Sequence, residues 1–426
     1  MTNEANESYY RATAIGQITR PTLHEARSAD VCIIGAGYTG LSCALHLAQS
    51  GMKAIVLEAE HAGFGASGRN GGQVITGQRL DQVELRQRYG DTHARALWDL
   101  ALEAKAIVRE LITAHNIKCD VKFGQMAAAV KSKHAKELCD YAEYLEKHYN
   151  YKSNRFIPER EMPSLVATSS YKGGMYDSEG FHLHPLNYAL GLARAVDAAG
   201  VAILENSRVV KVEHGDRVTV STNSGTVTAD FVVYACNGYL ENLNHDLSAT
   251  IMPISNYVAA TEPLGEARAR ALIPSDSAIA DTKFVLDYYR LSADHRLIFG
   301  GGETYGAKDE KDPARFVRPC IVRVFPQLAD IKIDYAWGGR LAITMPRLPH
   351  IGRLNPKTYF AQGYSGQGVA IATLTGKLIA EAIVGQASRF DVMANLKIPP
   401  LPGGRFLRQP LLMLGLVWYA LRDRLG

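Results

Sequence analysis

The sequence predicts an α/β fold in which a Rossmann-like domain carries an inserted α+β domain built on a mixed antiparallel sheet. Three observations support this prediction. A strand, a glycine-rich turn, a helix and a second strand follow one another between residues 30 and 58. Short strands alternate with helices again at 185–235 and 359–383. Amphipathic helices and strands of mixed polarity separate these stretches, so the Rossmann-like domain is expected to be discontinuous.

The first unit begins with the apolar strand 30–34 and the turn Gly35-Ala36-Gly37-Tyr38-Thr39-Gly40. The following helix has apolar residues three and four positions apart, and Gly51 is placed to end it. A second apolar strand, 54–57, leads to Glu58. The glycines allow a tight turn, a close approach to a pyrophosphate and close packing of the helix, whose N-terminus favours anions. The unit therefore predicts a dinucleotide site in which Glu58 binds ribose hydroxyls and disfavours NADP.

A second glycine-rich stretch, GFGASGRNGGQ at 63–73, follows directly. Its small and polar residues allow the backbone to run flat against a ligand. The backbone N–H groups suit the edge of a flavin ring, and a nicotinamide dinucleotide does not need a second glycine loop. A flexible surface loop is the alternative interpretation. This segment favours FAD over NAD.

The rest of the chain is expected to continue both domains. We expect amphipathic helices at 91–115 and 134–148, which we assign to the inserted domain. The expected α/β elements are a helix at 185–200, strands at 201–204, 208–214, 217–222, 225–229 and 231–235, and a last helix at 371–383, with a hairpin spanning 286–300. The predicted cofactor domain comprises 29–83, 181–245 and 345–400, the substrate domain comprises 84–180 and 246–344, and 401–426 form a C-terminal apolar helix or tail.

Composition excludes several classes of protein. The 426 residues include 47 Lys+Arg and 43 Asp+Glu, a net charge of +4 that is too small and scattered for a nucleic-acid surface. Six cysteines contain no CxxC pair, which favours reduced thiols and no metal site. Residues 1–30 lack a secretory signal, and the apolar run 411–421 is shorter than the ~18–20 residues of a membrane span. We expect a cytoplasmic protein without a transmembrane segment.

Four segments together resemble the D-amino-acid oxidase-like (DAO) family of FAD-dependent oxidoreductases, which has the glutathione-reductase type of fold. They are 30–58, 63–73, VVYACNGY at 232–239 and GYSGQG at 363–368. The similarity extends from about residue 30 to residue 404. The segments LDYYRLSADHRLIFGGG, KIDYAWGG and LPGGRF are most similar to members that oxidise gamma-glutamylputrescine, whereas related members oxidise other amines and amino acids.

The resemblance implies which residues bind FAD. Members that bind flavin covalently place a His or Cys near the ring, but this chain has Arg69-Asn70 in the loop and no Cys between 336 and 368, so we expect dissociable FAD. The N-terminus of helix 371–383 would stabilise the charge of the reduced flavin. The positions implied to contact the cofactor are Gly35, Gly37, Tyr38, Thr39, Gly40, Glu58, Ala59, Gly65, Ala66, Ser67, Arg69, Asn70, Gly71, Gly72, Gln73, Val209, Val210, Gly363, Tyr364, Ser365, Gly366, Gln367 and Gly368.

The implied reaction is oxidation of a primary amine, gamma-glutamylputrescine or a similar polyamine-derived amine, to an aldehyde. Hydride transfer to flavin N5 would be followed by reduction of O2 to H2O2. The amine must first lose a proton, at a cost of about 4–5 kcal/mol at neutral pH, and an aromatic, desolvating pocket lowers that cost. Tyr288, Arg290, Trp337 and His184 are the candidate catalytic residues, with Arg290 placed to pair with a substrate carboxylate. Strand core for the aromatic residues and a surface position for Arg290 are the alternatives.

Two other functions remain open. A dehydrogenase of the same fold would pass electrons to a quinone, with the apolar segment 406–421 lying on a membrane surface. The alternative, which the apolar pattern favours, is that this segment packs on its own protein or on a partner subunit of an oligomer. An FAD-binding regulatory or RNA-modifying module would need a basic surface, which the charge balance does not support. His182 and His184 share a strand face, but no third metal ligand lies near them.

Overall fold

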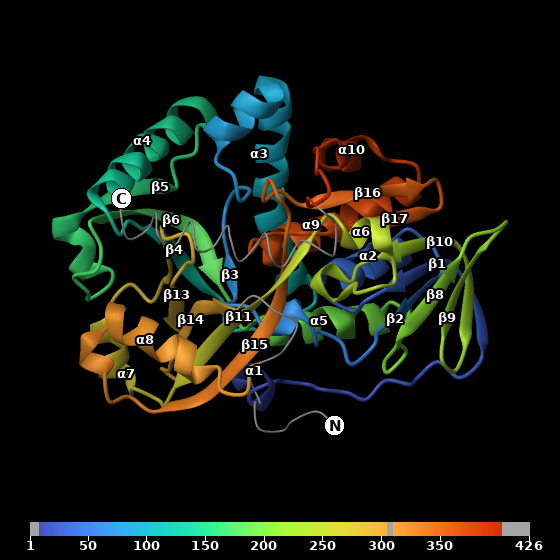
Figure 1. Cartoon of the computed structure of the whole chain (residues 1–426), viewed down its shortest axis with the longest axis horizontal. Helices are drawn as coiled ribbons and strands as arrows, with labels where there is room; N and C mark the ends of the chain where they lie inside the picture. The colour runs from blue at the N-terminus through green and yellow to red at the C-terminus, as the bar shows by residue number, and fades with distance from the viewer. Residues whose placement is uncertain (1–7, 305–309, 403–426) are drawn as a thin grey trace.

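The computed structural model describes residues 8–304 and 310–402, and the apolar segment 406–421 lies outside this range. The chain builds two sheets, whose strands lie on opposite sides of the molecule in Figure 1. In the described part of the chain, no helix has the length and apolarity needed to cross a bilayer.

The first sheet has eight strands, and its core is parallel. The central strand β1 (Ala26–Ile34) pairs with β2 (Ala54–Leu57) and β10 (Thr226–Tyr234) in parallel. The parallel core is completed by β7 (Ala202–Leu204) and β17 (Thr358–Gln362), while β8 (Val209–Glu213), β9 (Val218–Thr222) and β16 (His350–Asn355) pair antiparallel. Strand order β16-β17-β10-β1-β2-β7 places the carboxyl ends of five parallel strands at one edge, where ligands bind in such sheets.

Helices bury the apolar strands of this sheet. The contacting helices α2 (Tyr38–Gln49) and α9 (Gly368–Ile383) lie beside it, and α5 (Pro185–Ala198) packs on α2 (Figure 1). The start of α2 lies close to the end of β1, and Gly40 makes this possible because it has no side chain. A Cβ at this position would stand 1.9 Å from the Gly35 carbonyl oxygen. The predicted strand–turn–helix–strand unit is confirmed, with Gly51 at a positive φ just after α2.

The second sheet has nine strands and is mainly antiparallel. Its order is β15-β11-β14-β13-β12-β4-β6-β3, with β5 on β6, and only β12 and β4 pair in parallel. These strands are β3 (Gln73–Val74), β4 (Lys122–Ala128), β5 (Asn154–Pro158), β6 (Gly173–His182), β11 (Met252–Thr261), β12 (Ala278–Asp281), β13 (Tyr288–Leu291), β14 (Leu297–Thr304) and β15 (Ile333–Ile343). Helices α4 (Ser132–Tyr149), α7 (Glu266–Leu272) and α8 (Ala314–Val324) belong to this half of the molecule (Figure 1). The predicted α/β class with an inserted mixed sheet is confirmed.

The structure corrects several boundaries. The two strands expected at 225–229 and 231–235 form one strand, β10, because it pairs with β1 on both sides of Asp230, at Ala229 and at Phe231. The last long helix begins at Gly368, not at residue 371. Five of the described helices were not predicted: α1 (Tyr9–Ala12), α6 (His245–Ser248), α7, α8 and α10 (Ser388–Ala394).

The long helix α3 (Gln82–Ala114) bears on the proposed domain division. It starts nine residues before the expected position and is interrupted at Gly90, whose φ of 81° breaks the helical path. Its buried face belongs to the same hydrophobic cluster as α2 and α9, although we assign 84–180 to the substrate domain. The division into discontinuous cofactor and substrate domains stays a proposal, and α3 lies at its boundary.

Candidate active site

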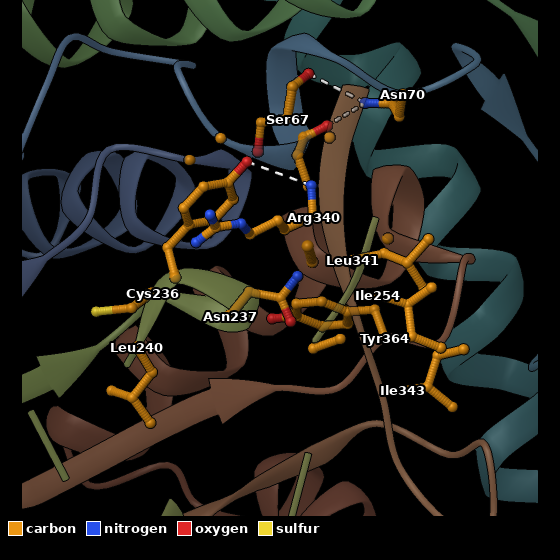
Figure 2. Close-up of a pocket in the computed structure, with 18 of the residues that line it drawn as sticks. Ser67, Asn70, Cys236, Asn237, Leu240, Ile254, Arg340, Leu341, Ile343 and Tyr364 are labelled. Atoms are coloured by element: carbon orange, nitrogen blue, oxygen red, sulfur yellow. Dashed lines mark hydrogen bonds between the residues drawn. The ribbon is translucent and has the colours of Figure 1, made fainter. Parts of the chain in front are cut away.

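A cavity of about 910 Å³ is lined by residues from both sheets. The first sheet contributes the turns after β1, β2 and β10, and the second contributes β11, β13 and β15. Figure 2 shows a part of this wall, with Ser67 and Asn70 at one side and Cys236 and Leu240 at another. A single cavity therefore reaches from the dinucleotide turn to the inserted sheet.

The turn after β1 forms one end of the cavity. Gly35, Gly37, Tyr38 and Thr39 lie on the wall, and the Tyr38 N–H donates to Ser67 Oγ at 3.0 Å. A Cβ at Gly37 would stand 2.9 Å from Ser67 Oγ, so a side chain there would fill the space beside the turn. Gly40 is not among the described residues on the wall, and its role is to let the helix approach the strand. This arrangement fits a pyrophosphate at the start of α2.

Glu58 faces the cavity at the end of β2, beside Ala59. Its carboxylate accepts hydrogen bonds from the N–H groups of Ala36 at 2.7 Å and Glu60 at 3.0 Å. Burial raises the pKa of this carboxyl above its ordinary value, although both hydrogen bonds oppose the shift. Val209 and Val210 lie on the same wall. The position suits the predicted role of Glu58 as an acceptor for ribose hydroxyls.

The loop 63–73, which we call the flavin loop, is held by side chains of its own. Asn70 Nδ2 donates to the carbonyl of Ala66 at 2.9 Å and to that of Ser67 at 3.0 Å (Figure 2), and Asn70 Oδ1 accepts from Gly72 N–H at 2.7 Å. Gly72 is not on the described wall, but its φ of 75° and its approach to the Leu183 carbonyl leave no room for a Cβ. Of the predicted loop contacts, the cavity is lined by Gly65, Ala66, Ser67, Arg69, Asn70, Gly71 and Gln73.

A third segment, far along the chain, closes the cavity. Tyr364, Ser365, Gly366 and Gly368 line it, whereas Gly363 and Gln367 are not among the described lining residues. Gly368 is the first residue of α9, so the N-terminus of this helix meets the cavity. Three segments that are distant in sequence thus surround one space with a pyrophosphate turn, a ribose acceptor and a second glycine loop. These residues fit FAD.

Sequence reasoning missed a fourth segment, which follows β10. Cys236, Asn237 and Tyr239 line the cavity, and the Tyr239 hydroxyl accepts from the Arg340 N–H at 3.3 Å (Figure 2). Burial raises the pKa of the Cys236 thiol to about 12, so this thiol is protonated at neutral pH. The signal was present, because this segment ends a parallel strand next to β1 and such ends meet at the ligand edge.

The structure brings only one of the four candidate catalytic side chains to the cavity. Tyr288 of β13 lies on the wall and donates a hydrogen bond to Asn256 Oδ1. Arg290, two residues on, turns to the flavin loop, where Nε donates to the Gly71 carbonyl at 2.8 Å. Its other nitrogens donate to the Leu291 carbonyl at 3.1 Å and to the Tyr10 hydroxyl at 3.2 Å. Because Arg290 is buried and is not among the described lining residues, the geometry does not support its predicted pairing with a substrate carboxylate.

Trp337 and His184 are also away from the described cavity wall. Trp337 is fully buried and donates its indole N–H to the Arg69 carbonyl at 3.0 Å. His184 caps α5 by accepting from the Asn187 N–H at 3.1 Å, and Nε2 lies 3.0 Å from Thr13 Oγ1. Burial lowers the pKa of His184 to about 3, so it is neutral at physiological pH. Trp337 therefore contacts the flavin loop and His184 caps α5, and neither is assigned to the chemistry.

The end of the cavity next to the second sheet is apolar and aromatic and includes arginines, among them Arg340 of β15. Ile254, Leu286 and Leu341 contribute apolar surface, and Arg79 and Arg347 also line the wall. The Arg347 guanidinium lies over the Phe284 ring at 4.3 Å. The acids among the described lining residues, Glu58, Glu60 and Glu241, belong to the first sheet's turns, and none of the described lining residues is a histidine. No cluster of metal-ligating side chains occurs in the described ranges.

Comparisons with known proteins agree with this geometry. Residues 30–382 match the family model described as FAD dependent oxidoreductase (DAO). The chain is 43% identical to gamma-glutamylputrescine oxidoreductase from Escherichia coli over 424 residues, which cover 99% of both chains. It is 39% identical to a probable oxidoreductase, OrdL, from Haemophilus influenzae, over 98% of this chain and 97% of that protein. The crystal structure of glycine oxidase from Geobacillus kaustophilus matches with a TM-score of 0.70 at 19% identity, covering 84% of this chain and 95% of that one, a similarity of fold alone.

Proposed function

Because this chain belongs to the DAO family of FAD-dependent oxidoreductases, we propose that it oxidises a primary amine, gamma-glutamylputrescine or a similar polyamine-derived amine, to an aldehyde. The observation that carries the proposal is the 43% identity to an Escherichia coli enzyme named for that substrate, across 99% of both chains. The family assignment itself confirms the resemblance in the sequence and the prediction of FAD.

The lining residues suit an amine at the flavin end of the cavity. When bound, FAD supplies the acceptor for a hydride from the amine-bearing carbon, and O2 then takes the two electrons and two protons to form H2O2. Tyr288 and the apolar residues beside it desolvate the amine, which lowers its pKa and favours the neutral form that can lose a hydride. The amine proton is released to water, and water hydrolyses the resulting imine to the aldehyde and ammonia.

Arg347 is the better candidate for a carboxylate at the other end of the substrate. It lines the cavity, and its described interactions are the contact with the Phe284 ring and a backbone hydrogen bond to Thr344, so its guanidinium nitrogens are open to a ligand. A guanidinium binds a carboxylate through two parallel hydrogen bonds. A gamma-glutamylated amine carries such a carboxylate, and a simple diamine does not. In this proposal Arg347 takes the role first expected of Arg290.

We further propose that FAD is held without a covalent bond. The cysteine described on the wall, Cys236, is a neutral thiol near Glu58 at the ribose end, and a thiolate is the form that would react. Acid precipitation of the purified protein should therefore release all yellow colour into the supernatant. Colour that stays with the peptide would contradict this part of the proposal.

A substrate screen tests the function and separates the acceptors. The FAD-loaded protein is incubated in air with gamma-glutamylputrescine, putrescine, and D- and L-amino acids, and both aldehyde and peroxide are measured. We expect equal amounts of aldehyde and peroxide, with gamma-glutamylputrescine the best substrate. Aldehyde formed only with an added quinone would favour the dehydrogenase. The segment expected to contact the membrane in that alternative, 406–421, lies outside the described residues. Aldehyde from none of the amines would refute the proposed function.

A further inference from the structure

Arg290 carries a buried charge that amine oxidation, as proposed above, does not use. The residue is 3% exposed and stands on β13 in the second sheet. Its side chain bonds to Gly71 of the flavin loop, and Arg290 is not among the described residues that line the cavity.

Each hydrogen-bond partner of this guanidinium is neutral. Two are backbone carbonyls, of Gly71 and Leu291, and the third is the Tyr10 hydroxyl. Among the described residues, no carboxylate forms an ion pair with Arg290. The two acids nearest along the chain already have other partners. Asp287 pairs with Lys283 and Arg323, and Asp294 is bonded to Tyr9, Ser292 and Arg296. An unpaired charge in a protein interior is costly, so a buried cation of this kind indicates an anionic group in its surroundings.

The neighbouring titratable groups do not neutralise this charge. His182 and His184 are both buried, and burial together with the Arg290 charge lowers the pKa of each imidazole to about 3. Tyr10 is fully buried, and burial raises the pKa of its phenol. These three side chains are therefore neutral at physiological pH, and the positive charge of Arg290 stands alone among them.

The flavin loop contacts both this charge and the cavity. Gly71 lines the cavity and also accepts the Arg290 Nε–H at 2.8 Å. A Cβ at Gly72 would stand 3.1 Å from Nη2 and 3.2 Å from Nε, so the guanidinium lies close to this stretch of backbone. A negative charge that develops in the cavity beside Gly71 would be attracted to this guanidinium.

We propose that Arg290 is a positioning residue that stabilises the electron-rich reduced form of FAD over the oxidised form, by holding a positive charge against the flavin loop. The anionic group that the buried cation lacks in the protein is supplied by the cofactor when it is reduced. The role depends on FAD binding alone and holds for any substrate, so it stands or falls separately from the proposed amine oxidation.

The test compares the affinities for oxidised and reduced FAD in variants of Arg290. These variants separate the effect of its positive charge from that of its hydrogen bond to the flavin loop. Arg290→Lys keeps the charge, Arg290→Met removes it, and Arg290→Gln removes it but retains a donor toward the Gly71 carbonyl. Trp337→Phe is the matched control, because it deletes a neutral hydrogen bond to the same loop. The readouts are the dissociation constant of oxidised FAD and the midpoint potential of bound FAD, neither of which needs a substrate.

In the two neutral variants we expect the ratio of the affinities for reduced and oxidised FAD to fall about tenfold. This corresponds to a fall of about 30 mV in the midpoint potential of bound FAD, a two-electron couple. Arg290→Lys should keep the potential of the unmodified protein, and Trp337→Phe should weaken both redox forms alike and leave the potential unchanged. An unchanged potential in Arg290→Met and Arg290→Gln would overturn the proposal. So would equal loss in Arg290→Lys and the neutral variants, including a common failure to take up FAD, because Arg290 would then act only through its shape.

Discussion

The indole N–H of Trp337 donates to the backbone carbonyl of Arg69 at 3.0 Å, across 268 residues of sequence. Trp337 belongs to β15 of the second sheet and Arg69 to the flavin loop. A second hydrogen bond joins the same two segments, because Arg69 Nη1 donates to the Gly338 carbonyl at 3.1 Å. The inserted sheet and the cofactor loop are therefore fixed to each other, so that the substrate end of the cavity has a defined position relative to the flavin.

Replacing Trp337 by Phe should weaken FAD binding by about three- to tenfold, because a net hydrogen bond contributes about 0.5–1.5 kcal/mol. The substitution keeps an aromatic ring in the buried cluster and leaves the Arg69 carbonyl without this donor. Titration of the apoprotein with FAD measures the effect. An unchanged dissociation constant would mean that the loop keeps its position without this bond.

Glu58 should make FAD affinity depend on pH. Burial raises the pKa of its carboxyl in the free protein, and ribose hydroxyls donate to the ionised form, so binding favours loss of the proton. FAD affinity should therefore rise as the pH increases through this raised pKa and become constant above it. Glu58→Gln should bind FAD more weakly and lose this dependence. Titrations between about pH 5 and pH 8 test both statements, and parallel profiles for the two proteins would contradict the placement of Glu58 at the ribose.

Arg347→Ala should discriminate between substrates. We expect the KM for gamma-glutamylputrescine to rise by about ten- to a hundredfold, since a charge-assisted bond contributes about 1.5–3 kcal/mol, and the KM for putrescine to stay within twofold. Arg353→Ala is the control, because Arg353 pairs with Asp391 and is not on the described cavity wall. An equal rise of KM for both amines would remove Arg347 from the carboxylate role.

The parts of the site that could be predicted are those whose positions are determined by neighbouring residues in the sequence. The turn at Gly35 and the acceptor Glu58 were predicted because glycine spacing and strand ends determine their positions within one short unit. Arg290 and Trp337 were predicted as catalytic residues, whereas the structure has both bonded to carbonyls of the flavin loop. Strand alternation does not reveal whether a side chain reaches the cavity or a loop carbonyl. Tyr10 was missed because a polar N-terminal stretch gives no sign that its aromatic ring packs on His184 and Trp337.

His182 should contribute to acid sensitivity. Burial lowers its pKa to about 3 in the folded protein, while the unfolded chain takes up the proton near pH 6.5. The folded state thus loses stability as the pH falls from about 6.5 towards 3, by up to about 1.4 kcal/mol per pH unit for this group. His182→Gln, which retains a donor toward the Asp276 carbonyl, should flatten the decline by that amount. Urea unfolding of both proteins at about pH 7 and pH 5 measures it, and identical declines would show that His182 is protonated without cost.

The most direct measurement of the central claim is anaerobic mixing of the FAD-loaded protein with gamma-glutamylputrescine, followed by the absorbance of oxidised flavin. Neither O2 nor a quinone is present, so the result reports only the transfer of electrons from the amine to FAD. We expect rapid and complete bleaching by gamma-glutamylputrescine, slower bleaching by putrescine, and none by glycine or D-alanine. A yellow protein that stays oxidised with gamma-glutamylputrescine but is bleached by an amino acid would contradict the account.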